Sequence, residues 1–197
     1  MKNRFYRVAG LVTVMLLSGL TVLPARAAKV ADGTVNFTGE MLGATTCTLE
    51  NNSLAVDFGT INVDQNGAVP ANPLTPVKPV AFRFTGCATT IQKVNMTVSF
   101  DEYPYGGDSL IINTGGESMN VAGVLVCPAN ALMQGEDCTP GARIASGSVV
   151  HGVVSNREVS FPLEVSLVSF NAFDPSSPDM PDAGSINMTV NFTFEEE

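Results

Sequence analysis

Positive charge is scarce in this sequence, and its scarcity excludes whole classes of partner. The chain carries 10 lysines and arginines against 19 aspartates and glutamates, a formal net charge of −9. Residues 1–27 hold four of the basic residues and no acidic one, so the remainder has 6 basic and 19 acidic residues and a net charge of −13. Because nucleic-acid binding depends on Lys and Arg that neutralise phosphate, we predict no nucleic-acid partner and no affinity for anionic membranes.

Histidine is almost absent, and the motifs of common enzymes are missing. His151 is the only histidine, and it lies in the strand-like run 149–154. A hydrolase triad needs such a base beside a nucleophile and an orienting acid. The chain has no Gly-x-Ser-x-Gly elbow, no Walker loop and no Gly-x-Gly-x-x-Gly after a strand. The acidic pairs 101–102 and 136–137 fall in turn-like segments. We therefore predict no enzymatic activity, no catalytic residue, no metal and no cofactor.

Long apolar runs are confined to the start of the chain. Three basic side chains occur in the first seven residues, an uncharged run covers 8–23, and Ala25 and Ala27 occupy the small-residue positions of a cleavage site. That order is typical of a secretory signal peptide, whereas a membrane span needs about 20 apolar residues. We predict a signal peptide over 1–27, cleavage after Ala27, and export.

Four cysteines in an exported chain favour two disulfides, with three possible connectivities. The simplest pairing is Cys47 with Cys87 and Cys127 with Cys138. In the loop-entropy account these bonds would contribute about 4 and about 3 kcal/mol. Zinc is the alternative, but no Cys-x-x-Cys pair is present and His151 has no companion at ligand spacing.

Helical periodicity is also hard to find, and alternating strand patterns dominate. The first is residues 33–41, with Val35, Phe37, Gly39 and Met41 on one face. The clearest is 184–194. Such patterns, separated by turn residues, predict an all-β antiparallel sandwich. The predicted strands cover 33–41, 45–49, 54–58, 80–85, 94–100, 121–126, 149–154, 159–170 and 186–194, with loops at 64–79 and 174–184 and a short helical turn at 129–133.

Four stretches, in this order, resemble the type 1-like pilins, the chaperone–usher fimbrial subunits of Gram-negative bacteria. They are 33–40 followed by Cys47, 79–87 ending at Cys87, 161–167, and 184–194. The chain differs from the common pilin pattern in the three glutamates that follow Phe194 and in the pair Cys127 and Cys138.

The resemblance implies an immunoglobulin-like sandwich, residues 45–197, that lacks its last strand. A periplasmic chaperone would fill the gap first, and the N-terminal extension of another subunit, residues 28–44, would then replace it by β-strand addition. In that extension Val35, Phe37 and Met41 would fill pockets, and Gly39 would lie where a side chain is obstructed. The receiving groove would include Ile186, Met188, Val190, Phe192 and Phe194.

The function implied is a structural subunit of a surface fimbria that supports adhesion. Its partners would be other pilus subunits, a periplasmic chaperone and an outer-membrane usher. The alternative is an adhesive or ligand-binding sandwich, such as a minor or tip-proximal subunit or a self-contained exported module that recognises a host ligand. The two differ in residues 28–42. If the protein is a polymerising subunit, these residues should be free or paired with a neighbour. If it is a self-contained module, they should pair with their own sheet.

Overall fold

The computed structural model describes residues 29–42, 46–62, 73–103, 109–118, 120–128, 138–169 and 183–197. The predicted signal peptide, the helical turn at 129–133 and most of the loops at 64–79 and 174–184 lie outside these ranges. Within them the chain forms ten strands and no helix. The all-β prediction is confirmed. No helix of the described part is long and apolar enough to cross a membrane.

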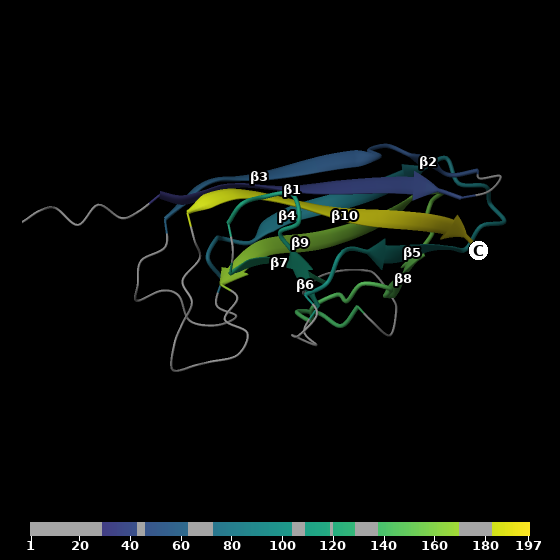
Figure 1. Cartoon of the computed structure of the whole chain (residues 1–197). Helices are drawn as coiled ribbons and strands as arrows, with labels where there is room; N and C mark the ends of the chain where they lie inside the picture. The colour runs from purple at the N-terminus through teal and green to yellow at the C-terminus, as the bar shows by residue number, and fades with distance from the viewer. Residues whose placement is uncertain are drawn as a thin grey trace, which may run out of the picture.

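The strands pack as two facing sheets (Figure 1). One sheet has the order β3-β1-β10-β5-β8, and the other has the order β2-β4-β9-β7-β6. All pairings are antiparallel except that of β1 with β10. The strands are β1 (Lys29–Met41), β2 (Thr48–Leu49), β3 (Ser53–Asn62), β4 (Lys78–Thr85), β5 (Lys93–Ser99), β6 (Leu110–Ile112), β7 (Val121–Val126), β8 (Val149–Val153), β9 (Val159–Ser169) and β10 (Gly184–Glu196).

Three elements differ from the sequence prediction. The strand expected at 45–49 is reduced to β2, two residues long, and β3 extends four residues beyond the expected 54–58. The sequence prediction missed β6, because three residues are too few for an alternation to be recognised.

Pro162 lies inside β9, where it faces Ala81 of β4, and the ladder with β7 begins only at Glu164. The missing N–H of a proline costs little where one side of a strand is unpaired.

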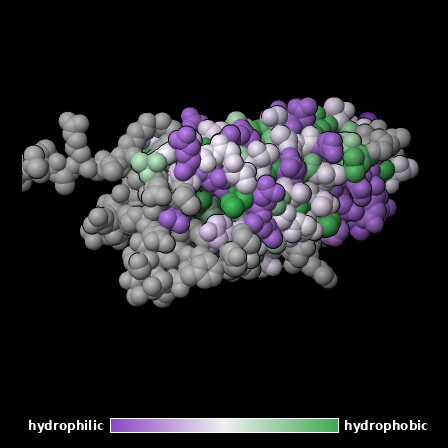
Figure 2. Space-filling view, viewed as in Figure 1, coloured by the Kyte–Doolittle hydropathy of each residue, from purple (hydrophilic) through white to green (hydrophobic). Residues whose placement is uncertain are grey.

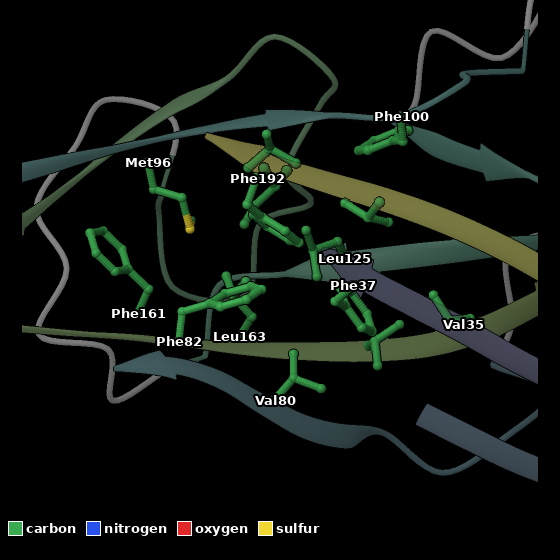
Figure 3. Close-up of a cluster of buried hydrophobic side chains, with 14 of the residues drawn as sticks. Val35, Phe37, Val80, Phe82, Met96, Phe100, Leu125, Phe161, Leu163 and Phe192 are labelled. Atoms are coloured by element: carbon green, nitrogen blue, oxygen red, sulfur yellow. The ribbon is translucent and has the colours of Figure 1, made fainter. Parts of the chain in front are cut away.

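The core lies between the sheets and is built from the alternate residues of every long strand. Its centre is aromatic: the ring of Phe82 lies 4.8 Å from that of Phe192 and 5.3 Å from that of Phe194, and Phe84 lies 4.7 Å from Phe194. In Figure 3 the side chains of Phe82 and Phe192 lie between those of Phe161 and Phe37 of β1. On the face seen in Figure 2, hydrophilic and intermediate residues predominate over scattered hydrophobic ones.

Both expected disulfides are present, in the pairing that the sequence made simplest. Cys47, just before β2, is bonded to Cys87, shortly after β4, and Cys127, just after β7, is bonded to Cys138. Arg157 supports the first bond, since its guanidinium donates to the carbonyls of Cys87 (2.8 Å) and Gly86 (3.2 Å). The first disulfide therefore joins the segment after β1 to the opposite sheet.

Within the single chain the sandwich is complete, and completion by the strand of a neighbouring subunit stays a prediction. Residues 29–41 form β1, which lies between β3 and β10 in the chain's own sheet. The physical reason is that β1 is tethered beside the position it fills. An intramolecular strand of matching pattern therefore buries its apolar row without the entropy cost of bringing two molecules together.

Candidate functional site

The candidate site is the position that β1 occupies between β3 and β10 in the first sheet (Figure 1). β1 runs parallel to β10, from Ala31 opposite Gly184 to Met41 opposite Phe194. It runs antiparallel to β3, from Lys29 opposite Asn62 to Thr38 opposite Ser53, with two irregularities in register. The backbone of this one segment therefore joins β3 to the remainder of its sheet.

The inward face of β1 carries the residues predicted for a donor strand. Val35 and Phe37 are fully buried, at 0% exposure, and Met41 packs half-buried against the core. The ring of Phe37 lies 5.9 Å from that of Phe192. These side chains fill the groove of their own chain; their entry into another subunit stays a prediction.

Gly39 lies where two aromatic rings leave no space. A Cβ at this position would lie 2.9 Å from Cε2 of Phe194 and 3.0 Å from Cε1 of Phe82. Both rings are fully buried, so neither has room to move aside. The surroundings of Gly33, at the other end of the segment, are less tight, since its nearest neighbours would lie 3.4 Å from an added Cβ. Gly39 is the more restrictive position in this arrangement.

The groove is formed by β10 together with the facing sheet. The inward residues of β10 are all buried at 3% exposure or less, and they are the five predicted from the sequence: Ile186, Met188, Val190, Phe192 and Phe194. Phe192 and Phe194 also contact the aromatic residues of β4 and β9. Occupation of the groove is therefore coupled to the centre of the core.

The outward face of β1 makes specific side-chain contacts that the sequence prediction missed. Asn36 Nδ2 donates to Asn187 Oδ1 at 2.9 Å, and Thr38 Oγ1 donates to Asn191 Oδ1 at 2.7 Å. Asparagine and threonine alternate on both strands, which was visible in the sequence, but alternation alone does not indicate which strands are neighbours. Both faces of β1 therefore contribute to its fit.

The glutamates at the end of β10 anchor the chain next to the first disulfide. The Glu196 carboxylate accepts hydrogen bonds from the backbone N–H of Thr46 (2.7 Å) and of Cys47, and from the Thr46 hydroxyl. The ammonium group of Lys93 lies 3.5 Å from the carboxylate of Glu197. This acidic tail, unusual for the resembled family, thus binds within its own chain.

That anchor dictates the direction of β1 within one chain. Thr46 is held at the Phe194 end of β10, and only five residues separate Met41 from Cys47. If β1 ran antiparallel to β10 with Asn36 still opposite Thr189, Met41 would lie beside Gly184. The chain would then have to cross about 40 Å, twelve strand residues, with a connection that reaches about 18 Å at most. Only the parallel direction is possible in cis.

Within the described ranges, no catalytic constellation accompanies this groove. His151 Nδ1 lies 2.6 Å from Asn95 Oδ1, a contact between neighbouring strands on the sheet surface. Among the described residues, no three His, Cys, Asp or Glu side chains form a group that could hold a metal. A hollow of about 350 Å³ lies beside the β8–β9 turn, lined by Arg83, Val153, Glu158 and Pro162 among others. Glu50 and Glu158 already pair with its arginine, at 4.0 and 3.9 Å.

Comparison with known proteins identifies the fold. No protein-family model matches the sequence, and no curated protein matches it. Among solved structures, the chain is similar to the P pilus rod subunit PapA, with a TM-score of 0.53 and 12% identity over 77% of this chain and 99% of that one. A second match is the CupB6 tip adhesin from Pseudomonas aeruginosa, with a TM-score of 0.46 and 7% identity over 81% of this chain and 39% of that one. The described chain therefore has the immunoglobulin-like sandwich fold of a pilus subunit.

Proposed function

We propose that this protein is a structural subunit of a surface fimbria, exported through the periplasm and assembled by strand exchange between copies. The observation that carries the proposal is that β1, which a short connection joins to the domain, supplies an interior strand of a sheet, between β3 and β10. Another copy carries the same strand, so its side chains match the pockets that β1 fills in its own chain. Exchange would conserve nearly all of the contacts that β1 makes.

Because exchange would keep the same contacts, it gains little binding energy, and the strand of another copy must compete with the chain's own β1. A tethered strand faces its groove at an effective concentration in the millimolar range, which favours the cis form in dilute solution. We therefore propose that a periplasmic chaperone occupies the groove before β1 does, and that an outer-membrane usher brings subunits together. Support for these partners comes from the fold of the similar rod subunit and from the resemblance in sequence.

A head-to-tail fibre follows if each copy fills the groove of another. Contacts between two different surfaces propagate without closing, and so produce a filament. The role is structural rather than catalytic, and adhesion would be a property of the assembled fibre.

The test is incorporation of a labelled synthetic peptide of residues 29–41 into the mature chain, residues 28–197, followed by native mass spectrometry. We expect slow formation of a one-to-one complex. A Phe37→Asp peptide should fail, because its carboxylate would be buried unpaired. A Thr34→Asp peptide is the matched control, since this side chain faces outward, and it should still be incorporated.

The same assay separates the proposal from the alternative of a self-contained ligand-binding module. The observed cis pairing of β1 is the arrangement that the sequence analysis predicted for such a module. The two functions still differ in the release of the strand, because a self-contained module has no reason to release it. If neither the peptide nor a second, isotope-labelled copy exchanges under conditions that open β1, the strand is a permanent part of the domain. The fimbrial proposal would then be wrong.

A further inference from the structure

The first half of β10 has a strand on one side only, within the described chain. β1 pairs with β10 from Gly184 to Phe194, whereas β5 pairs with it only from Asn191 onward. Residues 184–190 therefore have β1 on one side and no strand on the other. This half of β10 carries three of the five apolar side chains that form the groove: Ile186, Met188 and Val190.

Departure of β1 would leave this half of the groove wall without any strand neighbour. A single strand does not satisfy its backbone groups by itself, and it is not stable alone in water. If the wall is ordered for only a fraction of the time, the affinity for an incoming strand is reduced by that fraction. A groove that accepts a strand from another molecule therefore needs a second support for residues 184–190.

The connection between β6 and β7 makes contact with β10 on the side that lacks a strand. β6 and β7 belong to the facing sheet, but residues 113–118, which we call the strap, reach across to β10. The N–H of Gly115 donates to the carbonyl of Asn187 at 3.0 Å, and the N–H of Ser118 donates to the carbonyl of Ser185 at 2.9 Å. The strap thus occupies the place of a neighbouring strand, although it has no strand structure itself.

Asn113 completes this contact through its side chain. Its Oδ1 accepts from the N–H of Asn187 at 2.8 Å, and its Nδ2 donates to the carbonyls of Ser185 (3.1 Å) and Ser118 (2.8 Å). The side-chain amide therefore offers β10 one acceptor and one donor, as the backbone of a strand would. An aspartate here would keep the acceptor but lose the donor.

Glycines allow the strap to approach β10 at backbone distance. A Cβ on Gly116 would overlap the carbonyl oxygen of Ser185. On β10, a Cβ on Gly184 would lie 2.7 Å from the backbone nitrogen of Ser118. Because glycine lacks the Cβ, it permits this close approach of two backbones. The sequence of the strap is therefore suited to contact with β10.

The strap and β1 contact β10 independently of each other. Asn187 bonds to the strap through its backbone, whereas its side chain accepts from Asn36 of β1 at 2.9 Å. The hydrogen bonds described above run from the strap to β10 and do not involve β1, so departure of β1 removes none of them. The strap is also joined directly to the facing sheet, because β6 ends at Ile112.

We propose that the strap is a positioning device for strand exchange: it holds the first half of β10 extended while β1 is absent, so that an incoming strand meets a formed groove. Asn113 is the positioning residue on which the strap depends. That the incoming strand belongs to another copy of this chain rests on the proposed function, whereas the support of β10 by the strap does not.

Hydrogen exchange tests the support of β10 without any strand exchange. In the Phe37→Ala variant of the mature chain, exchange of the β1 amides should rise by about 10²-fold or more, because β1 detaches more often. The amides of Gly115 and Ser118, which donate to β10, should change by less than about threefold if the strap stays in place. If these two amides accelerate together with those of β1, the strap leaves with β1 and the inference is wrong.

Peptide uptake tests the consequence for exchange. The labelled 29–41 peptide is offered to the mature chain as wild-type, Asn113→Ala and Thr114→Ala. Asn113→Ala removes three hydrogen bonds, and it should slow incorporation by about tenfold or more, because the groove is formed for a smaller fraction of the time. Thr114→Ala changes an exposed side chain of the same strap and is the matched control, with uptake within about twofold of wild-type.

The direction of the change separates positioning from a general loss of stability. A variant that is only less stable releases its own β1 more often, so it would take up the peptide faster than the wild-type chain. Uptake by Asn113→Ala at the wild-type rate, or faster, would therefore overturn the inference.

Asn113→Asp keeps the test decisive if Asn113→Ala does not fold. This variant retains the acceptor for the N–H of Asn187, so its uptake should be slower than wild-type by a smaller factor than for alanine. Uptake at the wild-type rate would again overturn the inference. If even the wild-type chain rejects the peptide, the proposed function fails, and the hydrogen-exchange measurement still decides whether the strap supports β10.

Discussion

Phe37→Ala is the substitution that most directly measures how strongly β1 is held in its own chain. The ring is fully buried, contacts Phe192 at 5.9 Å between ring centres, and comes from the strand that completes the sheet. Truncation of a buried phenylalanine to alanine costs about 3–5 kcal/mol, part from lost transfer free energy and part from the cavity that remains.

This cost should appear first as detachment of β1 rather than as unfolding of the whole domain. The short connection from Met41 to Cys47 joins β1 to the rest of the described chain, so β1 can open as a local unit. A loss of about 3–5 kcal/mol corresponds to a rise of about 10²- to 5 × 10³-fold in the population of the detached form. Amide hydrogen exchange, resolved by residue, should show this rise for β1 and for the edge of β3 that it covers. Exchange in β7 and β9 should change far less.

Glu40→Ala is the matched control, because Glu40 is exposed on the other face of the same strand. A surface substitution of this kind should change stability by less than about 0.5 kcal/mol. The reasoning would be refuted if the amides of β1 were equally protected from hydrogen exchange in the Phe37→Ala and Glu40→Ala variants. That result would mean that β1 does not pack into the core of its own chain in solution.

Two further predictions concern the end of the molecule that carries Cys47. Replacing Cys47 and Cys87 by serine should lower the free energy of unfolding, measured in urea, by about 4 kcal/mol, and replacing Cys127 and Cys138 should lower it by about 3 kcal/mol. The first loss is larger because the first pair closes a span of 40 residues and the second a span of 11. A loss below about 1 kcal/mol from the first pair would contradict the loop-entropy account. Glu196→Ala should cost about 1–2 kcal/mol in the same assay, since it leaves the N–H groups of Thr46 and Cys47 without their charged acceptor. Glu195→Ala, at an exposed neighbouring position, should be close to neutral, and equal losses from the two would show that the hydrogen bonds of Glu196 contribute nothing.

The faces of β1 and β10 could be read from the sequence because strand geometry is strictly local. A period of two places Val35 and Phe37 on one side and Asn36 and Thr38 on the other, whatever the rest of the chain does. The same reasoning applies to Met188 and Val190 of β10. Cysteine spacing made Cys47–Cys87 the simplest pairing, and the structure contains that bond.

What the sequence left open was decided by contacts between residues about 150 positions apart. Alternation predicts that β1 needs a partner but not whose sheet it enters, because its own groove and a neighbour's groove offer the same side chains. Tertiary structure settles the cis arrangement: Glu196 holds Thr46 at one end of β10, and the connection after Met41 is too short for any direction but parallel. Local pattern thus determined which residues are buried, whereas the length of a five-residue connection, measured against the length of the sheet, determined how the strand runs.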